Sequence, residues 1–502
     1  MQIRRPGRAP LCIPGAHAYL AGRKRAGSGA LVIGAITDSI TRGVEGVTDR
    51  LVAPFTDPVI RLGVTGLSRA GKTVFITSLV ANLMDRGRMP QFAAAPRILG
   101  AVLRPQPDDT VARFDYEGHL AHLLAPEPEW PEGTRRVSEL RLSLRVQQGG
   151  MLAGVQGPRT VHLDIVDYPG EWLLDLGLLE KDYATWAREA LARAERRAAT
   201  MPQAAAFLKA VGAVEPVAPF DEPRAKALAR AFTDYLNAAR EAGYSDCTPG
   251  RFLLPGDLEG SPVLTFAPLP GGDTPKGSLG REVERRYEAY KREVVKPFFR
   301  DHFSRIDRQV VLVDVLSAIH AGPQAVEDLR AAMADILRAF RPGRNAFLSR
   351  IFQGRRIDRI LFAATKADHL HHTEHAKLAA ITEALLRDAR DRADFAGAKT
   401  QAMSIAALRT TVEDRVSHGG EMIDVVRGKL LETGRQAALH AGALPEDPSH
   451  LLAPARAGAE AWLDGDYSIM NFAPARLTLK PGEGPPHIRL DRAAEFLLGD
   501  RL

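Results

Sequence analysis

The chain has 502 residues, of which 45% are hydrophobic and 25% charged, a composition typical of globular proteins and a length sufficient for two or three domains. Its 67 basic and 61 acidic residues leave a formal charge of only +6, so we expect no nucleic-acid partner. Two distant cysteines argue against a disulfide framework, and no apolar run reaches the roughly 20 residues of a membrane span, so a cytoplasmic location is expected.

The N-terminal region is predicted to differ from the rest of the chain. Residues 1–35 are rich in Arg, Gly, Ala and Pro and predict a disordered basic arm. Residues 36–51 carry apolar side chains at helical spacing and predict an amphipathic helix, weakened by two glycines. In one interpretation this helix packs on the main domain. In the other it makes a peripheral contact with a membrane, such as the inner membrane, or with a partner.

From residue 60 onward, alternating strands and helices predict an α/β domain with a mixed, mostly parallel sheet. The strands are expected at residues 61–65, 139–146, 160–167, 309–315, 359–364 and 401–405, and the first helix at 73–84. The second and third strands are joined by a Gly-rich connection, which predicts an antiparallel hairpin at the edge of the sheet.

Long Ala/Leu/Arg/Glu-rich stretches in residues 171–305 predict a large, mostly helical insertion. This insertion separates a first part of the α/β domain, 36–170, from a second part, 306–440. Residues 441–502 form a C-terminal extension, and helices are expected to follow Ala407.

The segment Gly66–Thr73, with the sequence GLSRAGKT, fits the phosphate-loop pattern G-x-x-x-x-G-K-[ST] between a predicted strand and a predicted helix. Glycines let several backbone N–H groups converge on phosphate oxygens, and the N-terminus of the helix attracts the same anion. We expect Lys72 to reach the β- and γ-phosphates and the Thr73 hydroxyl to ligate Mg²⁺. The residues expected to contact the phosphates are Gly66, Ser68, Arg69, Ala70, Gly71, Lys72, Thr73 and Val74.

A second motif follows the predicted strand at 160–167. Asp167 ends this strand and begins the D-x-x-G sequence that closes at Gly170. We expect the carboxylate of Asp167 to hold Mg²⁺ and the backbone of Gly170 to distinguish a triphosphate from a diphosphate. An earlier match begins at Asp115, but no strand precedes it directly, so we interpret it as a decoy.

A third motif, Thr365-Lys366-Ala367-Asp368, follows the predicted strand at 359–364. The carboxylate of Asp368 can accept hydrogen bonds from N1–H and N2 of guanine, a donor pair that adenine lacks, so GTP or GDP is the expected ligand. The alkyl stem of Lys366 can cover one face of the base. A backbone N–H for the guanine O6 is expected from the next strand end, comprising Ser404, Ile405, Ala406 and Ala407.

Together these segments resemble the Ras-like, translation-factor-related GTPases and, more closely, the YcjX-like family of bacterial stress-associated GTP-binding proteins. The resemblance rests on the segments VTGLSRAGKT, FDYEGHLAHLL, DYPGEWLLDL, QVVLVDVLSA and TKADHL. It implies a P-loop, Ras-like GTPase fold with a large helical insertion, a switch that responds to the nucleotide, and a stress-related role.

Two positions depart from the general GTPase pattern. Glu171 stands where many of these proteins have a glutamine that orients the attacking water, so we expect slow intrinsic hydrolysis. The effector-loop threonine that completes the Mg²⁺ site is best matched by Thr134, with Ser138 and Thr110 as alternatives. Arg69 is either an internal arginine finger or an ordinary loop residue.

The sequence therefore predicts a Mg²⁺-dependent GTP hydrolase. The candidate catalytic residues are Lys72, Arg69, Gly170 and Glu171. One alternative is an ATPase in which the TKAD sequence is incidental. Another is a nucleotide-gated scaffold with negligible hydrolysis, whose helical insertion binds a protein effector or a membrane.

Overall fold

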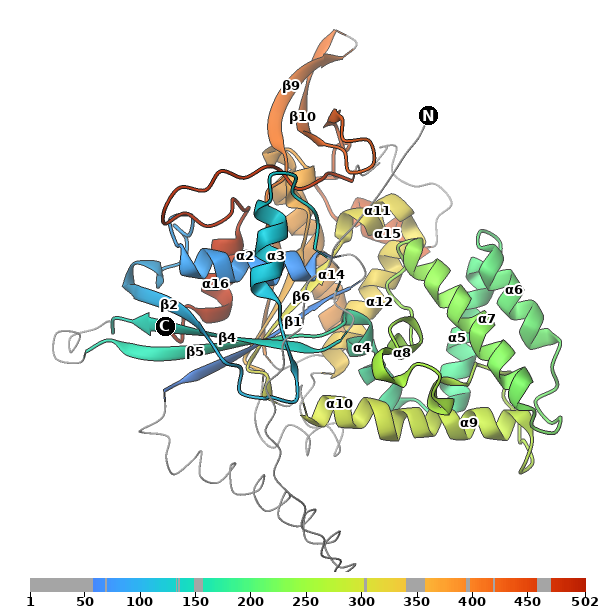
Figure 1. The fold of residues 1–502 in the computed structure, drawn as a ribbon. Helices are drawn as coiled ribbons and strands as arrows, with labels where there is room; N and C mark the ends of the chain where they lie inside the picture. Colours follow the sequence, from blue (N-terminus) through green and yellow to red (C-terminus); the bar gives the residue numbers. More distant parts are fainter. Residues whose placement is uncertain are drawn as a thin grey trace, which may run out of the picture. The chain divides into compact units, whose positions relative to one another are not determined.

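Strands and helices alternate in two parts of the chain, residues 59–167 and 308–404, with a helical stretch between them (Figure 1). The computed structural model describes residues 57–67, 70–131, 133, 136–148, 157–301, 305–339, 357–393, 398–418, 420–457 and 471–502. The predicted basic arm and amphipathic helix therefore lie outside the described residues.

Within the described ranges, the main sheet has eight strands in the order β2-β4-β5-β1-β6-β7-β8, with β3 paired to β4. The strands are β1 (Val59–Gly66), β2 (Ile98–Arg104), β3 (Ala112–Arg113), β4 (Ser138–Val146), β5 (Arg159–Asp167), β6 (Arg308–Val313), β7 (Arg359–Ala364) and β8 (Lys399–Ser404). Strand β4 is antiparallel to both β2 and β5, whereas the successive pairs β5–β1, β1–β6, β6–β7 and β7–β8 are parallel. The predicted fold class, a mostly parallel sheet with an antiparallel hairpin toward one edge, is confirmed.

Strand β2 extends the sheet beyond the predicted hairpin, and its sequence did not indicate a strand. Its ladder to β4 shifts register between Ile98 and Gly100, which interrupts the period-2 pattern that identifies a half-buried strand.

Helices cover both faces of the sheet. They are α2 (Lys72–Met84), α3 (Tyr116–Leu124), α11 (Val315–Ala321), α12 (Pro323–Ala339), α14 (His375–Ala393), α15 (Ser449–Ala457) and α16 (Leu490–Leu498). In β6, Val310 and Leu312 pack in the core beneath α2 and α16, whereas Val311 and Val313 pack in the core beneath α12 and α14. This strand is buried on both faces, which explains its continuous apolar sequence.

Between β5 and β6 the described residues form helices and turns, with one isolated bridge between Pro219 and Ser278. The helices are α4 (Gly170–Leu174), α5 (Tyr183–Arg197), α6 (Pro202–Gly212), α7 (Glu222–Glu241), α8 (Gly250–Leu253), α9 (Leu279–Tyr290) and α10 (Lys296–Asp301). Helices α5, α6, α7 and α9 gather at one side of the sheet (Figure 1). This helical content agrees with the sequence pattern, while the exact domain boundaries stay predictions.

The prediction of helices after Ala407 is wrong for residues 412–439. They form a second, three-stranded antiparallel sheet of β9 (Val412–His418), β10 (Glu421–Lys429) and β11 (Gln436–Leu439). Its buried core consists of Val426, Leu439 and Phe472, so few apolar positions mark the strands in the sequence. The turn at Gly420, which has φ +90°, was the available hairpin signal.

Candidate functional site

The phosphate-loop segment begins where β1 ends, at Gly66, and enters α2 at Lys72. The Leu67 N–H donates to the carbonyl of Leu312 on β6 at 2.9 Å, which attaches the loop to the neighbouring strand. Gly71 has φ +74°, and a Cβ at this position would meet nothing within 4 Å. Among the described residues, no atom crowds this side of the N-terminus of α2, so an anion can approach it.

Lys72 and Asp167 form an ion pair between the first residue of α2 and the last residue of β5. The Nζ–Oδ1 distance is 2.5 Å, and the two side chains are 11% and 1% exposed. Thr73, the next residue of α2, is also buried. The residues predicted to neutralise phosphate charge and to hold the metal are thus neighbours. Hydroxyl and carboxylate oxygens are the donors that Mg²⁺ prefers, so this donor set fits the ion.

Gly170 packs directly against the backbone of the phosphate loop. A Cβ on Gly170 would lie 1.9 Å from the carbonyl oxygen of Gly66 and 3.2 Å from the backbone nitrogen of Leu67. The first distance is too short for any side chain, so this position requires glycine. The end of the D-x-x-G motif and the start of the phosphate loop therefore meet through their backbones.

Glu171 faces the helical segment, defined as helices α5, α6, α7, α8 and α9 between β5 and β6. Its Oε1 lies 3.6 Å from Nη1 of Arg240 on α7, and the two side chains are 15% and 27% exposed. A Cβ on Gly250 of α8 would lie 2.2 Å from the Glu171 carbonyl oxygen, so the two backbones also meet closely. Arg240 is a residue of the site that the sequence did not indicate, because only the fold brings α7 beside the D-x-x-G motif.

Asp175 links the same region to the helical segment from a buried position. Its Oδ1 accepts the Gly250 N–H at 2.8 Å, and its Oδ2 accepts the hydroxyl of Tyr290 at 2.5 Å. Burial raises the pKa of Asp175 to about 7, although hydrogen bonds from Tyr290 and Gly250 oppose this shift. The chain after D-x-x-G is therefore anchored at several points in the helical segment.

At the other end of the site, Asp368 lies in a short 3₁₀ turn after β7, where it is 4% exposed. Its Oδ2 accepts the backbone N–H of Thr410 at 2.9 Å and the Thr410 hydroxyl at 2.7 Å. The Thr411 hydroxyl donates to the Asp368 carbonyl. The sequence did not indicate Thr410, which fixes the orientation of the predicted base-reading carboxylate.

Lys366 has a left-handed backbone with φ +60°, which is unusual for a residue other than glycine. Its Nζ lies 2.5 Å from Oδ2 of Asp314, and that oxygen also accepts the hydroxyl of Ser317 at 2.7 Å. The Thr365 N–H donates to the carbonyl of Val313 at 2.9 Å. The TKAD segment is thus held to the end of β6.

The segment predicted to serve the guanine O6 is only partly available. The Ile405 N–H donates to the carbonyl of Ala364 at 2.7 Å, and the Ala406 N–H to that of Ile488 at 3.0 Å. The Ser404 hydroxyl donates to the backbone of α14 at His375. The backbone N–H groups of Ile405 and Ala406 are thus already used within the protein, and the predicted contact with the guanine O6 stays a prediction.

The candidates for the effector-loop threonine occupy different places. Ser138 begins β4, is 8% exposed and pairs in register with Asp167, so this strand end borders the phosphate region. The Thr110 hydroxyl is instead bonded to Asp108 in an exposed turn. The earlier D-x-x-G match caps a helix, because the Asp115 carboxylate accepts the Gly118 N–H at the start of α3.

Three predicted site residues, Ser68, Arg69 and Thr134, lie outside the described residues, so their roles stay predictions. Ala70 is buried beside the loop and Val74 is half-buried on α2. Across the part of the chain that the structure describes, no helix has the length and apolar character needed to cross a bilayer.

Comparisons with known proteins place the chain in a family. The model of the YcjX-like family matches residues 60–502. The Ras-like GTPase YcjX of Escherichia coli (strain K12) is 38% identical over 471 residues, covering 90% of this chain and 98% of the relative. The Ras-like GTPase YcjX of Shewanella oneidensis is 36% identical over 475 residues, covering 89% and 95%. The chain is therefore a member of the YcjX-like family.

Proposed function

We propose that this chain binds GTP together with Mg²⁺, hydrolyses GTP to GDP and acts as a nucleotide-dependent switch. The proposal rests on the meeting of the phosphate loop and the D-x-x-G motif, where Lys72 and Asp167 approach to 2.5 Å. Strand β7, which carries Asp368 at its end, is separated from β1 only by β6 in the same sheet. The names of the two relatives, both Ras-like GTPases, support the same function.

At the phosphate end, Lys72 exchanges its contact with Asp167 for the β- and γ-phosphate oxygens. Thr73 and Asp167 are the residues that would hold Mg²⁺, which supplies positive charge to the phosphoryl group during transfer to water. The Gly170 N–H would donate to a γ-phosphate oxygen, a role supported by the close approach of Gly170 to the backbone of Gly66. Loss of that oxygen on hydrolysis releases the D-x-x-G segment, which is the basis of the switch.

At the base end, Asp368 accepts N1–H and the exocyclic N2 amine of guanine. The hydrogen bonds from Thr410 hold this carboxylate in place before the base arrives, which reduces the entropic cost of binding. Adenine has no donor pair for the carboxylate and would not supply the two hydrogen bonds that guanine gives to this buried group, so an ATPase is disfavoured.

Calorimetry with GDP and ADP tests the base assignment. We expect GDP to bind at least about 100-fold more tightly than ADP, because two charge-assisted hydrogen bonds contribute about 1.5–3 kcal/mol each. Asp368→Asn should weaken GDP and favour xanthosine diphosphate, whose ring presents an acceptor where guanine has a donor. Equal affinities for GDP and ADP would contradict the guanine assignment.

The second candidate, a nucleotide-gated scaffold, is favoured by the ion pair between Glu171 and Arg240, which engages the Glu171 carboxylate with the helical segment. Phosphate release from GTP with Mg²⁺ distinguishes the two functions. Slow release that Lys72→Ala abolishes identifies a hydrolase. Tight GTP and GDP binding with no release above the buffer blank identifies a scaffold.

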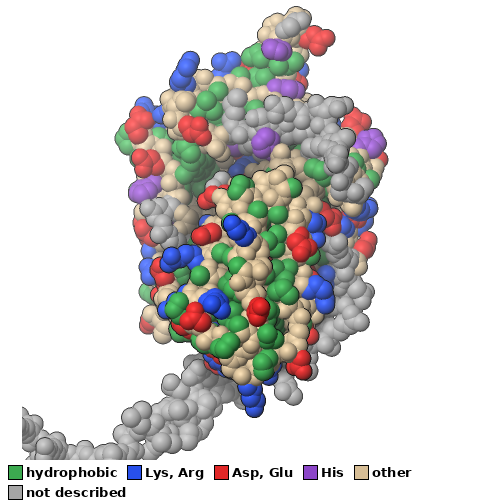
Figure 2. Space-filling view, turned by 90° about the vertical axis from the view of Figure 1, so that its right-hand side faces the viewer, with side chains coloured by type: hydrophobic (Ala, Val, Ile, Leu, Met, Phe, Trp, Pro, Cys, Tyr) green, Lys and Arg blue, Asp and Glu red, His purple; other side chains and the backbone are tan. Residues whose placement is uncertain are grey.

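The helical segment is the proposed contact surface for an effector. Figure 2 shows basic, acidic and apolar side chains interspersed over this face, with no broad basic patch among its described residues. Such a surface suits a protein partner better than an anionic membrane, which attracts clusters of Lys and Arg. A stress-related role and a cytoplasmic location stay predictions from the sequence.

A further inference from the structure

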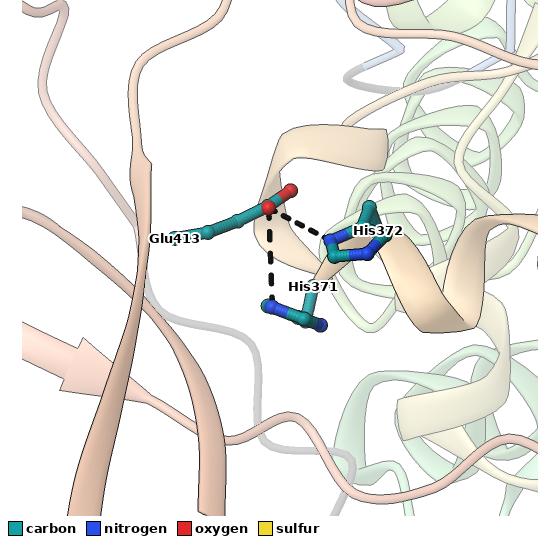
Figure 3. Close-up of side chains that lie close together, drawn as sticks. All are labelled: His371, His372 and Glu413. Carbon is teal, nitrogen blue, oxygen red and sulfur yellow. Dashed lines mark hydrogen bonds and ion pairs between the residues drawn. The ribbon is translucent and has the colours of Figure 1, made fainter.

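We propose that His371, His372 and Glu413 form a site for a divalent transition-metal ion such as Zn²⁺, separate from the proposed Mg²⁺ site. The two histidines follow the TKAD motif, and Glu413 lies near the start of β9 (Figure 3). One ligand atom from each of the three side chains lies within 4.8 Å of the others. Residues far apart in the sequence thus present three metal-ligand groups to one point.

The two imidazoles point to the same carboxylate oxygen. Oε2 of Glu413 lies 2.8 Å from Nδ1 of His372 and 3.8 Å from Nε2 of His371 (Figure 3). Tetrahedral Zn²⁺ with ligand bonds of about 2.0–2.2 Å requires ligand atoms about 3.4 Å apart. The contact of 2.8 Å would widen and the contact of 3.8 Å would shorten, each by less than about 1 Å, and the two imidazole nitrogens lie within 4.8 Å of each other.

The other ring nitrogen of His371 is engaged by groups that select the correct tautomer. Its Nδ1 lies 3.0 Å from the hydroxyl of Thr373 and 3.7 Å from Oδ2 of Asp424 on β10. A histidine that binds a metal through one nitrogen commonly donates its other N–H to an oxygen, which orients the ring. Nε2 of His371 is therefore the nitrogen left to ligate a cation.

Two arginines lie nearby, and each contacts the carboxylate oxygen that is not directed at a histidine. Arg409 lies 3.6 Å from Oε1 of Glu413, and Arg415 lies 2.7 Å from Oδ1 of Asp424. The oxygens Oε2 and Oδ2 remain on the side of the imidazoles. The two guanidinium groups thus contact the oxygens that do not face the imidazoles. Their positive charge still lowers the affinity for a metal cation below that of two carboxylates without arginine partners.

The ligand set determines which metal fits. Imidazole nitrogen suits Zn²⁺, Ni²⁺ and Cu²⁺, whereas Mg²⁺ prefers oxygen donors, so this site does not compete with the nucleotide for Mg²⁺. His372 is 63% exposed, which leaves at least one coordination position for water. A zinc ion with three protein ligands keeps one position open to water, whereas structural zinc ions have four protein ligands. The proposed site is therefore of the accessible type.

The proposed ion would join two segments that also meet at the base-reading residue. Asp368 and Thr410 are already hydrogen-bonded to each other, and each lies three residues before a member of the metal site, His371 and Glu413 respectively. A metal would therefore fasten the same two segments at a second point. An effect of the metal on guanine binding would rest on the proposed function. The metal site itself does not, because the ion can bind in the absence of nucleotide.

Zinc titration of the full chain, without a histidine tag and after removal of metals, tests the site. Competition with a chromophoric chelator in excess Mg²⁺ and without nucleotide measures the stoichiometry and the Kd. We expect one equivalent of Zn²⁺ with a Kd of about 10 µM or tighter, held by three protein ligands. Co²⁺ should give the visible absorption band of a four-coordinate nitrogen–oxygen site.

Matched variants locate the binding. His371→Ala and Glu413→Gln should each weaken Zn²⁺ at least tenfold and abolish the Co²⁺ band, while His450→Ala, on α15, leaves both unchanged. Glu413→Gln preserves shape, so it separates loss of a ligand from loss of folding, which circular dichroism monitors. Absence of stoichiometric Zn²⁺ binding, or equal binding by wild type and these variants, overturns the proposal. GDP affinity is measured separately, so failure of the metal site leaves the proposed function intact.

Discussion

At the base end of the candidate site, Asp368 and Lys366 are each held by a residue of another segment, Thr410 and Asp314. At the phosphate end, Lys72 and Asp167 are held by each other. A ligand at the base end therefore meets a carboxylate that is already oriented. In the proposed function, a triphosphate at the other end separates this ion pair, so the larger rearrangement is expected there.

This difference suits a protein whose conformation responds to the number of phosphates on the nucleotide, while recognition of the base stays the same. The phosphate end is also the end connected to the helical segment, through Glu171 with Arg240 and through Asp175 with Tyr290. A rearrangement of D-x-x-G would reach these contacts directly. The base end instead contacts the small antiparallel sheet through Thr410 and Thr411, just before β9.

The largest expected effect comes from removing the cation of the phosphate end. Lys72→Ala should lower phosphate release from GTP at least about 100-fold, because one charged donor to a developing anion is worth about 10²–10³ in rate. Lys209→Ala, an exposed lysine on α6, is the matched control and should retain the wild-type rate. Turnover by Lys72→Ala at the wild-type rate would mean that this lysine is not part of the active site.

A smaller effect is expected from crowding the contact between D-x-x-G and the phosphate loop. Gly170→Ala places a Cβ where Gly66 O is only 1.9 Å away, so one backbone must move. Hydrolysis should fall at least about tenfold, equivalent to about 1.4 kcal/mol, with GDP affinity changing less. The control is Gly177→Ala, whose Cβ would meet nothing closer than 3.9 Å. Equal behaviour of the two variants would contradict a sensing role for this contact.

At the base end, Thr410→Val removes the hydroxyl that donates to Asp368 and keeps the backbone donor. The affinity for GDP should fall about 2- to 10-fold, because one net hydrogen bond contributes about 0.5–1.5 kcal/mol. Thr410→Ser should restore it, and kcat should be unaffected. A fall in kcat with unchanged GDP affinity would show that Thr410 acts elsewhere, and the contrast between the two ends would fail.

The smallest effect concerns stability and the buried carboxyl of Asp175. Its pKa of about 7 lies above the usual 3.8, so its favourable contribution is complete below about pH 4 and is lost as the pH rises to about 7. Asp175→Asn should therefore make Tm less dependent on pH between 5 and 8, by about 2 °C or more. Glu139 on β4 has a pKa similarly raised to about 7 by burial, so part of the slope will remain. An unchanged slope in the variant would exclude Asp175 as its source.

Sequence reasoning worked where burial imposes a simple pattern. Strands β6 and β7 are continuous apolar runs, and β4 and β5 alternate, so their ends and the motifs at those ends were identifiable. The antiparallel sheet after β8 was missed because it buries few residues. Its strands are mostly exposed and polar, and such a pattern does not distinguish a strand from a helix.

The sequence also could not predict which residues contact the motif residues. Asp314 directly follows the valine-rich strand β6, so its position at a strand end was visible in the sequence. Nothing in the sequence connects this acid with Lys366. Arg240 lies on a helix whose sequence shows only an amphipathic period. Its proximity to Glu171 depends on how the helical segment docks.

The sequence by itself determined where along the chain the motif-bearing strands lie and which chemical groups follow them, because strand periodicity and loop chemistry are local properties. Only the tertiary structure decided which groups meet: Lys72 with Asp167, Asp368 with Thr410, and the two adjacent histidines with Glu413. These contacts join residues far apart in the chain. Their geometry depends on packing of the whole sheet and its helices, which no local pattern encodes.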